Sequence, residues 1–149
     1  MATYTDSLGF NKGSAAFPAL VDFISKFDVE LDFAAINAAR TAAGATALAA
    51  ADVLQVINLP ANAVVLSAGL EVITTDASTA TFDLGFTGGS PAAANAYAND
   101  AAISTAGYTV ADLANPTAVK VADTIDLLIN TAAPTTGKIR VFAVVADVS

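Results

Sequence analysis

The chain has 149 residues, of which 55% are hydrophobic and only 13% are charged, and this length suits one domain with a sizeable core. Fourteen acidic against six basic residues give a formal net charge of -8, which argues against nucleic acid and anionic membrane surfaces as partners. The chain has no Cys, His or Trp. This excludes disulfides, thiolate or imidazole metal sites and Ser–His–Asp catalysis.

Residues 1–26 predict an N-terminal arm, because their first part is polar and follows neither a strand nor a helix period. Two interpretations stay open: a frayed terminus, or an arm that becomes ordered against a neighbouring subunit. In the second, Tyr4 and Phe10 are the anchors on the neighbouring subunit. Around Pro18 the pattern fits either a short helix or the approach to a strand.

Residues 27–149 predict an all-β domain, a β-sandwich of the jelly-roll or a related Greek-key type. The clearest strand is 27–33, where apolar residues alternate with Asp28, Glu30 and Asp32. Gly69 marks a possible bulge. Further strands are expected over residues 52–59, 63–75, 79–86, 117–122, 124–130 and 138–148.

Two Ala-rich segments are expected to lie outside the sheets. Residues 34–51 could form a helix by propensity, but they lack a stripe of large apolar side chains. This predicts a strand end and a surface loop that includes one helical turn. Residues 33–51 are also too polar to be a membrane span. Residues 92–107 predict a long loop. Tyr97 within it and Tyr108 directly after it are expected as exposed contacts for a partner or as covers of the sandwich edge.

The acidic residues of strand 27–33 share one face and are about 6.6 Å apart. Lys138 and Arg140 have the same spacing, so this strand is predicted to lie beside the last one, with basic side chains opposite the acids. The main alternative is a solvated face, and a Ca²⁺ ion that bridges subunits is the minor one. A glycosidase pair would fit the spacing, but the face is flat and lacks a Trp platform.

No catalytic residue, cofactor or metal site is expected. Residues 85–90 (GFTGGS) resemble a phosphate loop only superficially, because no Lys follows the glycines. No Ser or Thr is placed beside a suitable base, so the protein is predicted not to be an enzyme.

The last strand is apolar on both faces. A strand of this kind must be covered on both sides, so Phe142 and Val144 are predicted to be covered by a partner or by the arm.

Residues 52–85 (DVLQVINLPANAVVLSAGLEVITTDASTATFDLG) resemble a pattern found in virion structural proteins of tailed bacteriophages, particularly cyanophages. In that pattern a strand leads through a Pro-Ala-Gly turn to a Val-rich strand that ends in Thr-Thr, followed by T-x-D-x-G. Asn62 replaces the usual glycine, and Asn also adopts a left-handed backbone. The matching residues are Asp52, Gln55, Leu59, Pro60, Ala61, Val65, Thr74, Thr75, Thr81, Asp83 and Gly85.

The resemblance implies a capsid decoration (cement) protein on the outer surface of the virion. In this interpretation Tyr4, Phe10 and Phe17 of the arm face the capsid or a neighbouring subunit. Its partners would be the major capsid protein and itself, with a homotrimer favoured, and it would stabilise the mature head by mass action. Nucleic acid and membranes are not expected partners. Two alternatives are a tail, neck or fibre-linked virion component, and a carbohydrate-binding or adhesin module.

Overall fold

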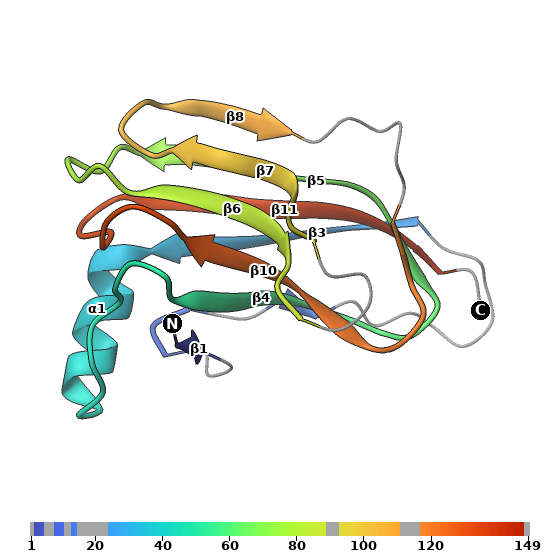
Figure 1. The fold of residues 1–149 in the computed structure, drawn as a ribbon, viewed down its shortest axis with the longest axis horizontal. Helices are drawn as coiled ribbons and strands as arrows, with labels where there is room; N and C mark the ends of the chain where they lie inside the picture. The colour runs from blue at the N-terminus through green and yellow to red at the C-terminus, as the bar shows by residue number, and fades with distance from the viewer. Residues whose placement is uncertain are drawn as a thin grey trace.

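Two β-sheets packed face to face form the body of the molecule (Figure 1). The computed structural model describes residues 2–4, 8–10, 13–14, 24–88, 93–110 and 117–147. The first sheet has the order β1 (Thr3–Tyr4), β4 (Val53–Leu59), β10 (Asp123–Ile129), β6 (Thr81–Phe86) and β7 (Ala93–Ala102), with β2 (Gly13–Ser14) also paired to β4. The second has the order β3 (Ile24–Asp32), β11 (Lys138–Asp147), β5 (Ala63–Thr74) and β8 (Gly107–Val110), with β9 (Thr117–Val119) also paired to β5.

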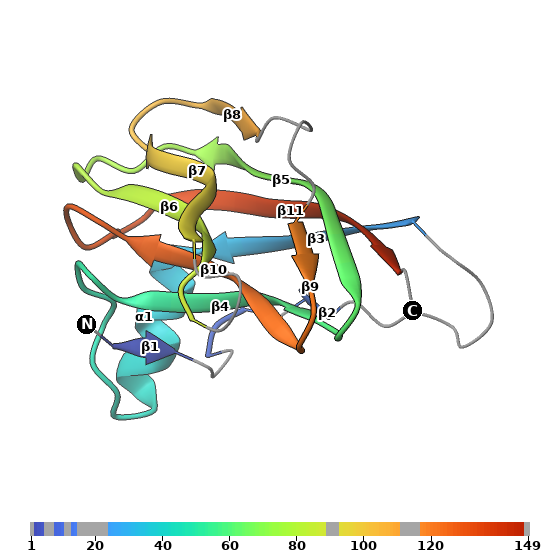
Figure 2. The same cartoon turned by 45° about the vertical axis from the view of Figure 1, so that its right-hand side comes forward.

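This architecture confirms the predicted all-β sandwich, while the jelly-roll subtype stays a prediction. All seven strands expected from the sequence are present, each within three residues of its expected bounds. The ladders are antiparallel, except that β1 and β2 add to β4 in parallel. β10 lies between β4 and β6, and β11 lies between β3 and β5, so these two strands, which follow their neighbours in the sequence, are internal to their sheets (Figure 2).

Side chains from the facing sides of both sheets fill the core. Phe82, Leu84 and Phe86 of β6 all point inward and are fully buried, as their alternation predicts. The rings of Phe33 and Phe82 stack with centroids 5.3 Å apart. The inward face of β11 is also completely buried; it consists of Ile139, Val141, Ala143 and Val145.

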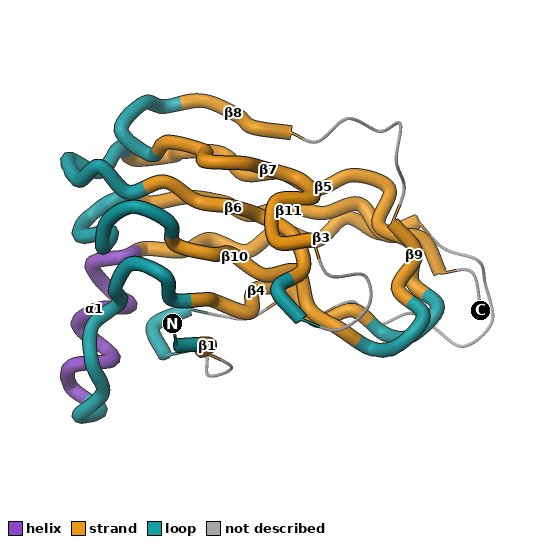
Figure 3. Tube along the Cα trace, in the orientation of Figure 1, coloured by secondary structure: helices purple, strands orange, loops and turns teal. Residues whose placement is uncertain are grey.

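The first part of the Ala-rich segment after β3 is a helix and not the expected loop, whereas residues 43–51 do form a loop as expected. α1 (Phe33–Ala42) lies at one end of the sandwich (Figure 3). Asp32 caps its N-terminus, because its carboxylate accepts the Ala35 N–H at 3.1 Å. Gly44, at φ 75°, follows its C-terminus in the left-handed conformation that glycine adopts without strain.

The buried face of α1 explains why the helix was missed. Its buried residues are Phe33, Ile36 and Arg40, which recur at helical spacing. One of these three is charged, and most of the helix is alanine, so the sequence shows no apolar stripe. No helix in the part of the chain that the structure describes is long and apolar enough to cross a membrane.

The loop expected over residues 92–107 is also wrong, because most of this segment is strand β7, which pairs with β6. Gly85 permits the close approach of the two strands. A methyl group placed on Gly85 would overlap the carbonyl oxygen of Ala93 and lie 2.7 Å from that of Ala94. The register between β6 and β7 shifts twice, so β7 lacks the simple alternation that would have revealed it.

Two further details concern backbone geometry. The bulge expected at Gly69 is wrong, because Gly69 pairs regularly with Phe142, and the β5–β11 register shifts instead between Lys138 and Ile139 and between Val144 and Val145. Asn62 has φ 65°, which confirms the left-handed conformation expected where the phage pattern has glycine.

Candidate functional site

The outward surface of the second sheet gathers most of the candidate residues that the sequence suggested. We call it the outer sheet face and define it by the outward side chains of β3, β11, β5 and β8. The register aligns them in four rows across the strands: Asp32–Lys138–Thr74, Glu30–Arg140–Glu71–Tyr108, Asp28–Phe142–Gly69 and Lys26–Val144–Ser67.

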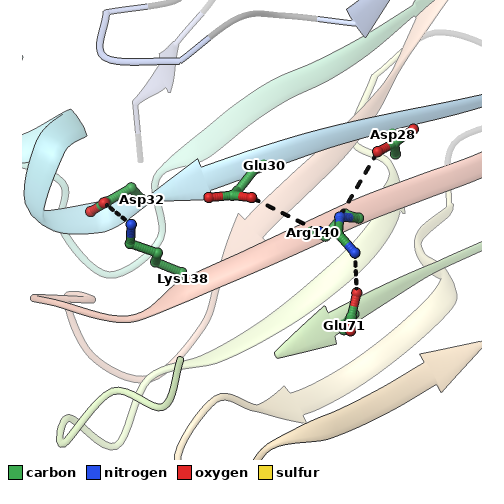
Figure 4. Close-up of polar contacts among 6 residues, drawn as sticks. All are labelled: Asp28, Glu30, Asp32, Glu71, Lys138 and Arg140. Carbon is green, nitrogen blue, oxygen red and sulfur yellow. Dashed lines mark hydrogen bonds and ion pairs between the residues drawn. The ribbon is translucent and has the colours of Figure 1, made fainter. Parts of the chain in front are cut away.

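The predicted pairing of the acidic strand with the basic start of the last strand is confirmed. Lys138 Nζ lies 2.8 Å from Asp32 Oδ2. The Arg140 guanidinium lies 3.9 Å from Asp28 Oδ2 and 4.0 Å from Glu30 Oε2 (Figure 4). The basic side chains therefore do lie among the acids, as cross-strand charge pairing requires.

The strongest partner of Arg140, which the sequence alone does not reveal, is Glu71 on β5. Arg140 Nη1 donates to Glu71 Oε2 at 2.7 Å, from the side of β11 opposite β3 (Figure 4). Glu71 is the one acidic residue of β5. The β5–β11 register was needed to align it with Arg140, and the sequence alone did not provide that register.

These contacts perturb the titration of several groups. The hydrogen bond from Lys138, helped by the Ala35 N–H, holds the pKa of Asp32 below its usual value. The same contact with Asp32 raises the pKa of Lys138. A hydrogen bond to Glu71 raises the pKa of Tyr108.

The charges around Arg140 do not balance. Its guanidinium is shared by Asp28, Glu30 and Glu71, but only Glu71 is within hydrogen-bonding distance. The side chains of Asp28 and Glu30 are 53% and 51% exposed. The centre of the outer sheet face thus presents two accessible carboxylates whose ion pairs with Arg140 are long, at 3.9 and 4.0 Å.

A cavity of about 240 Å³ lies on the same face, beside Arg140 and Phe142, the residues of β11 that pair with Glu30 and Asp28. Phe142 contributes an apolar wall, and Tyr108 on β8 is 71% exposed. Phe142 lies opposite Gly69, which has no side chain to fill the adjacent position. The cavity is lined by Lys26, Glu71, Tyr108, Arg140 and Phe142.

The face changes character along β11. Lys138 and Arg140 at its start give way to Phe142 and Val144, both partly buried in this chain. On β3, the acids give way first to Lys26, which lines the cavity, and then to Ile24, which is 65% exposed. The cavity therefore lies where the acidic part of the face meets Lys26 and the apolar side chains of β11.

The N-terminal residues proposed as anchors have partners within the chain where they are described. The Arg40 guanidinium, only 3% exposed, lies 3.6 Å from the centre of the Tyr4 ring and donates to the Thr46 carbonyl at 2.9 Å. Phe10 packs against the core, and Phe17 lies outside the described residues.

The described parts of the expected arm also join the sandwich. β1 and β2 pair with β4, and β3 starts at Ile24, inside the range 1–26 expected for the arm. Much of the described N-terminal segment is thus part of the two sheets.

Tyr97 and Tyr108 differ in their exposure to solvent. Tyr97 belongs to β7, is 6% exposed and packs edge-on against Phe86 with ring centroids 5.7 Å apart. The expectation that it lies on an exposed loop is wrong. Tyr108 lies on β8 rather than on a loop, but it is exposed as expected.

A second hollow, of about 400 Å³, lies on the first sheet. Burial, followed by the charge of Asp126, raises the pKa of Asp123 there, although the Thr124 N–H opposes the shift. Among the described residues, no group of three or more Asp or Glu side chains is arranged to hold a metal ion. The lining residues are Gln55, Asn58, Leu59, Ala122, Asp123 and Thr124.

Comparison with known proteins finds no matching family model and no matching curated protein. Three solved structures are similar. The capsid of Ralstonia phage GP4 contains a chain with a TM-score of 0.60 and 17% identity, covering 99% of this chain and 97% of that one. The asymmetric unit of the cyanophage Pam1 capsid contains one with a TM-score of 0.57 and 22% identity, covering 89% and 91%.

The third structure is the acidic stable capsid of Helicobacter pylori bacteriophage KHP30, in which the similar chain has a TM-score of 0.56 and 16% identity, covering 87% and 90%. At these identities the likeness concerns the fold. The chain therefore has the fold of chains found in three phage capsid structures.

Proposed function

We propose that the protein is a structural component of a bacteriophage virion, and specifically a decoration protein on the outside of the major capsid lattice. The observation that carries the proposal is the likeness to three phage capsid chains over 87% to 99% of this chain. The phage-like pattern over residues 52–85, which form β4 to β6, supports it independently.

The size of the similar chains favours decoration. The alignments cover nearly equal shares of both chains, so each similar chain is about as long as this one. Each is thus a small capsid component with one sandwich. A chain of this kind suits a subunit added to a lattice that a larger protein builds.

We propose the outer sheet face as the surface that binds the capsid. Phe142, Val144 and Tyr108 offer accessible apolar surface there, next to charged groups that give orientation. The N-terminal anchors suit this role less well, because Tyr4 and Phe10 already pack within the chain. The phage pattern favours a homotrimer, whose contacts would use other surfaces.

Decoration would stabilise the head by mass action. A protein that binds only the assembled lattice shifts the equilibrium against expansion or bursting. A contact of ordinary size buries about 800 Å² on each partner, and repetition over the lattice multiplies a modest affinity. The proposed role is structural and uses no catalytic group.

The test is the amount of this protein, relative to the major capsid protein, in purified virions of the phage that encodes it, measured by quantitative mass spectrometry. A ratio set by the lattice, with loss of heat resistance in particles that lack the protein, is the expected result. A few copies per particle would assign it instead to the tail or neck. Absence from virions would overturn the proposal.

A further inference from the structure

We infer that the outer sheet face binds a protein surface on which a Lys or Arg side chain stands next to an apolar side chain. The inference rests on the proposed function, because it states the chemistry that the capsid surface must present. It joins two features of the same face. The first is a pair of carboxylates that Arg140 approaches only to 3.9 and 4.0 Å. The second is a cavity lined by the rings of Phe142 and Tyr108 together with Lys26, Glu71 and Arg140.

Asp28 and Glu30 are accessible and only weakly paired. Asp28 and Glu30 project from the same face of β3, about 6.6 Å apart. Arg140 is held by Glu71 at 2.7 Å and lies 3.9 Å and 4.0 Å from the other two carboxylates. Both carboxylates therefore retain acceptor capacity for charge-assisted hydrogen bonds from a partner's guanidinium or ammonium group.

The cavity on the same face can receive an apolar side chain of the partner. Its volume of about 240 Å³ is several times the roughly 30 Å³ that a water molecule occupies. Phe142 forms an apolar wall, and the exposed Tyr108 ring offers a large rigid surface. Tyr is among the residue types that contribute most to binding energy when a partner covers them. An apolar side chain placed here would lie beside the carboxylates, so one partner surface can satisfy both features.

Charge argues that the occupant is a different protein rather than a second copy. The chain has only six Lys and Arg residues and a net charge of -8. Three of the six are already engaged: Arg40 is buried, and Lys138 and Arg140 form the ion pairs of this face. A second copy would bring mainly negative charge to Asp28 and Glu30.

The experiment measures binding of the purified protein to capsids assembled without it. We expect the double variant Asp28→Asn/Glu30→Gln to bind about tenfold more weakly, with a smaller dependence on salt concentration. The matched control is Asp83→Asn/Asp100→Asn, which removes the same charge from β6 and β7 and should bind as the wild type does.

The apolar half is tested by Tyr108→Ala, for which we also expect about a tenfold loss. Its control is Val121→Ala, which shortens another exposed apolar side chain. Circular dichroism and thermal unfolding establish that each variant is folded, and sedimentation reports self-association.

The outcomes separate the two proposals. If the wild-type protein does not bind capsids, the proposed function is wrong. If it binds and both site variants bind equally well, the function stands and this inference is wrong. If the site variants lose self-association instead of capsid binding, the face belongs to a second copy, and the inference is again overturned.

Discussion

The Gly137 N–H donates a hydrogen bond of 2.9 Å to Oδ2 of Asp76, joining the turn before β11 to the turn after β5. The same carboxylate accepts the N–H groups of Ser78, Thr135 and Thr136 and the hydroxyl of Thr135. Asp76 is 2% exposed. One buried side chain thus connects two turns that lie some sixty residues apart in the sequence.

We predict that Asp76→Asn lowers the free energy of unfolding by about 3 kcal/mol. The amide replaces one acceptor oxygen by an NH₂ group, whose hydrogens would face backbone N–H groups that then lose their acceptor. Burial opposes ionisation of Asp76, but the N–H groups of Gly137, Ser78, Thr136 and Thr135 outweigh it and hold the pKa well below its ordinary value. Urea unfolding at neutral pH measures the loss. Asp83→Asn, on the more exposed side of β6, is the control.

The same lowered pKa predicts a pH dependence. A carboxylate with a lowered folded-state pKa gives its full stabilisation above its unfolded pKa of about 3.9, and loses it as the pH falls through the folded-state value. The free energy of unfolding of the wild type should therefore fall more steeply in acid than that of Asp76→Asn. Equal acid slopes would contradict the assigned role of this carboxylate.

Gly85→Ala should destabilise the protein by about 3 kcal/mol, because the added methyl overlaps the β7 backbone and β7 must move. Gly88→Ala is a matched control, since a methyl there meets nothing within 4 Å. Thermal unfolding compares the two. Similar midpoints for both variants would show that β7 does not lie this close to β6.

Asp32 has two functions that substitutions separate. Asp32→Asn keeps an acceptor that caps the helix but loses the ion pair to Lys138. Asp32→Ala loses both contacts, so its free energy of unfolding should be lower than that of Asp32→Asn by about 1 kcal/mol. In Lys138→Met, NMR titration should find the pKa of Asp32 raised toward its usual value. An unchanged pKa would mean that the contact does not form in solution.

Tyr4→Leu should lower the free energy of unfolding by about 1 kcal/mol, because it removes the ring that lies over the buried Arg40. Deletion of residues 1–16 should lower the stability further by unpairing the edge of β4, while leaving the sandwich folded. Denaturant unfolding measures both effects. Tyr108→Leu is the control, since that ring is largely exposed.

Large apolar side chains made most of the sandwich predictable. Alternation of residues such as Phe82, Leu84 and Phe86 revealed the strands, and the matching charges of Asp32 and Lys138 indicated that β3 lies beside β11. Alanine carries no such signal, because its small side chain adds little to an apolar stripe or an alternation, whatever its helix propensity. For this reason the Ala-rich sequences of α1 and β7 predict loops, although the segments form a helix and a strand.

The candidate site was only partly predictable for a related reason. Phe142 and Val144 stood out because β11 is apolar on both faces. Glu71 did not stand out, because the β5–β11 pairing contains two register shifts, and its alignment with Arg140 cannot be counted out from the sequence. Tyr97 and Tyr108 looked equivalent in sequence, and only the pairing of β7 with β6 shows that one is buried.

The central positions of β10 and β11 affect how the protein is made. The ribosome completes β3, β4, β5 and β6 before the strands that must lie between them exist. Neither sheet can therefore be completed while roughly the first 120 residues are synthesised, because the strands that join its two halves are missing. Until then the early strands have unpaired edges, which promote aggregation. Folding must wait for the last strands and depends on contacts distant in sequence, which makes it slow. A cell that produces many copies at once would have to keep these unfinished chains apart.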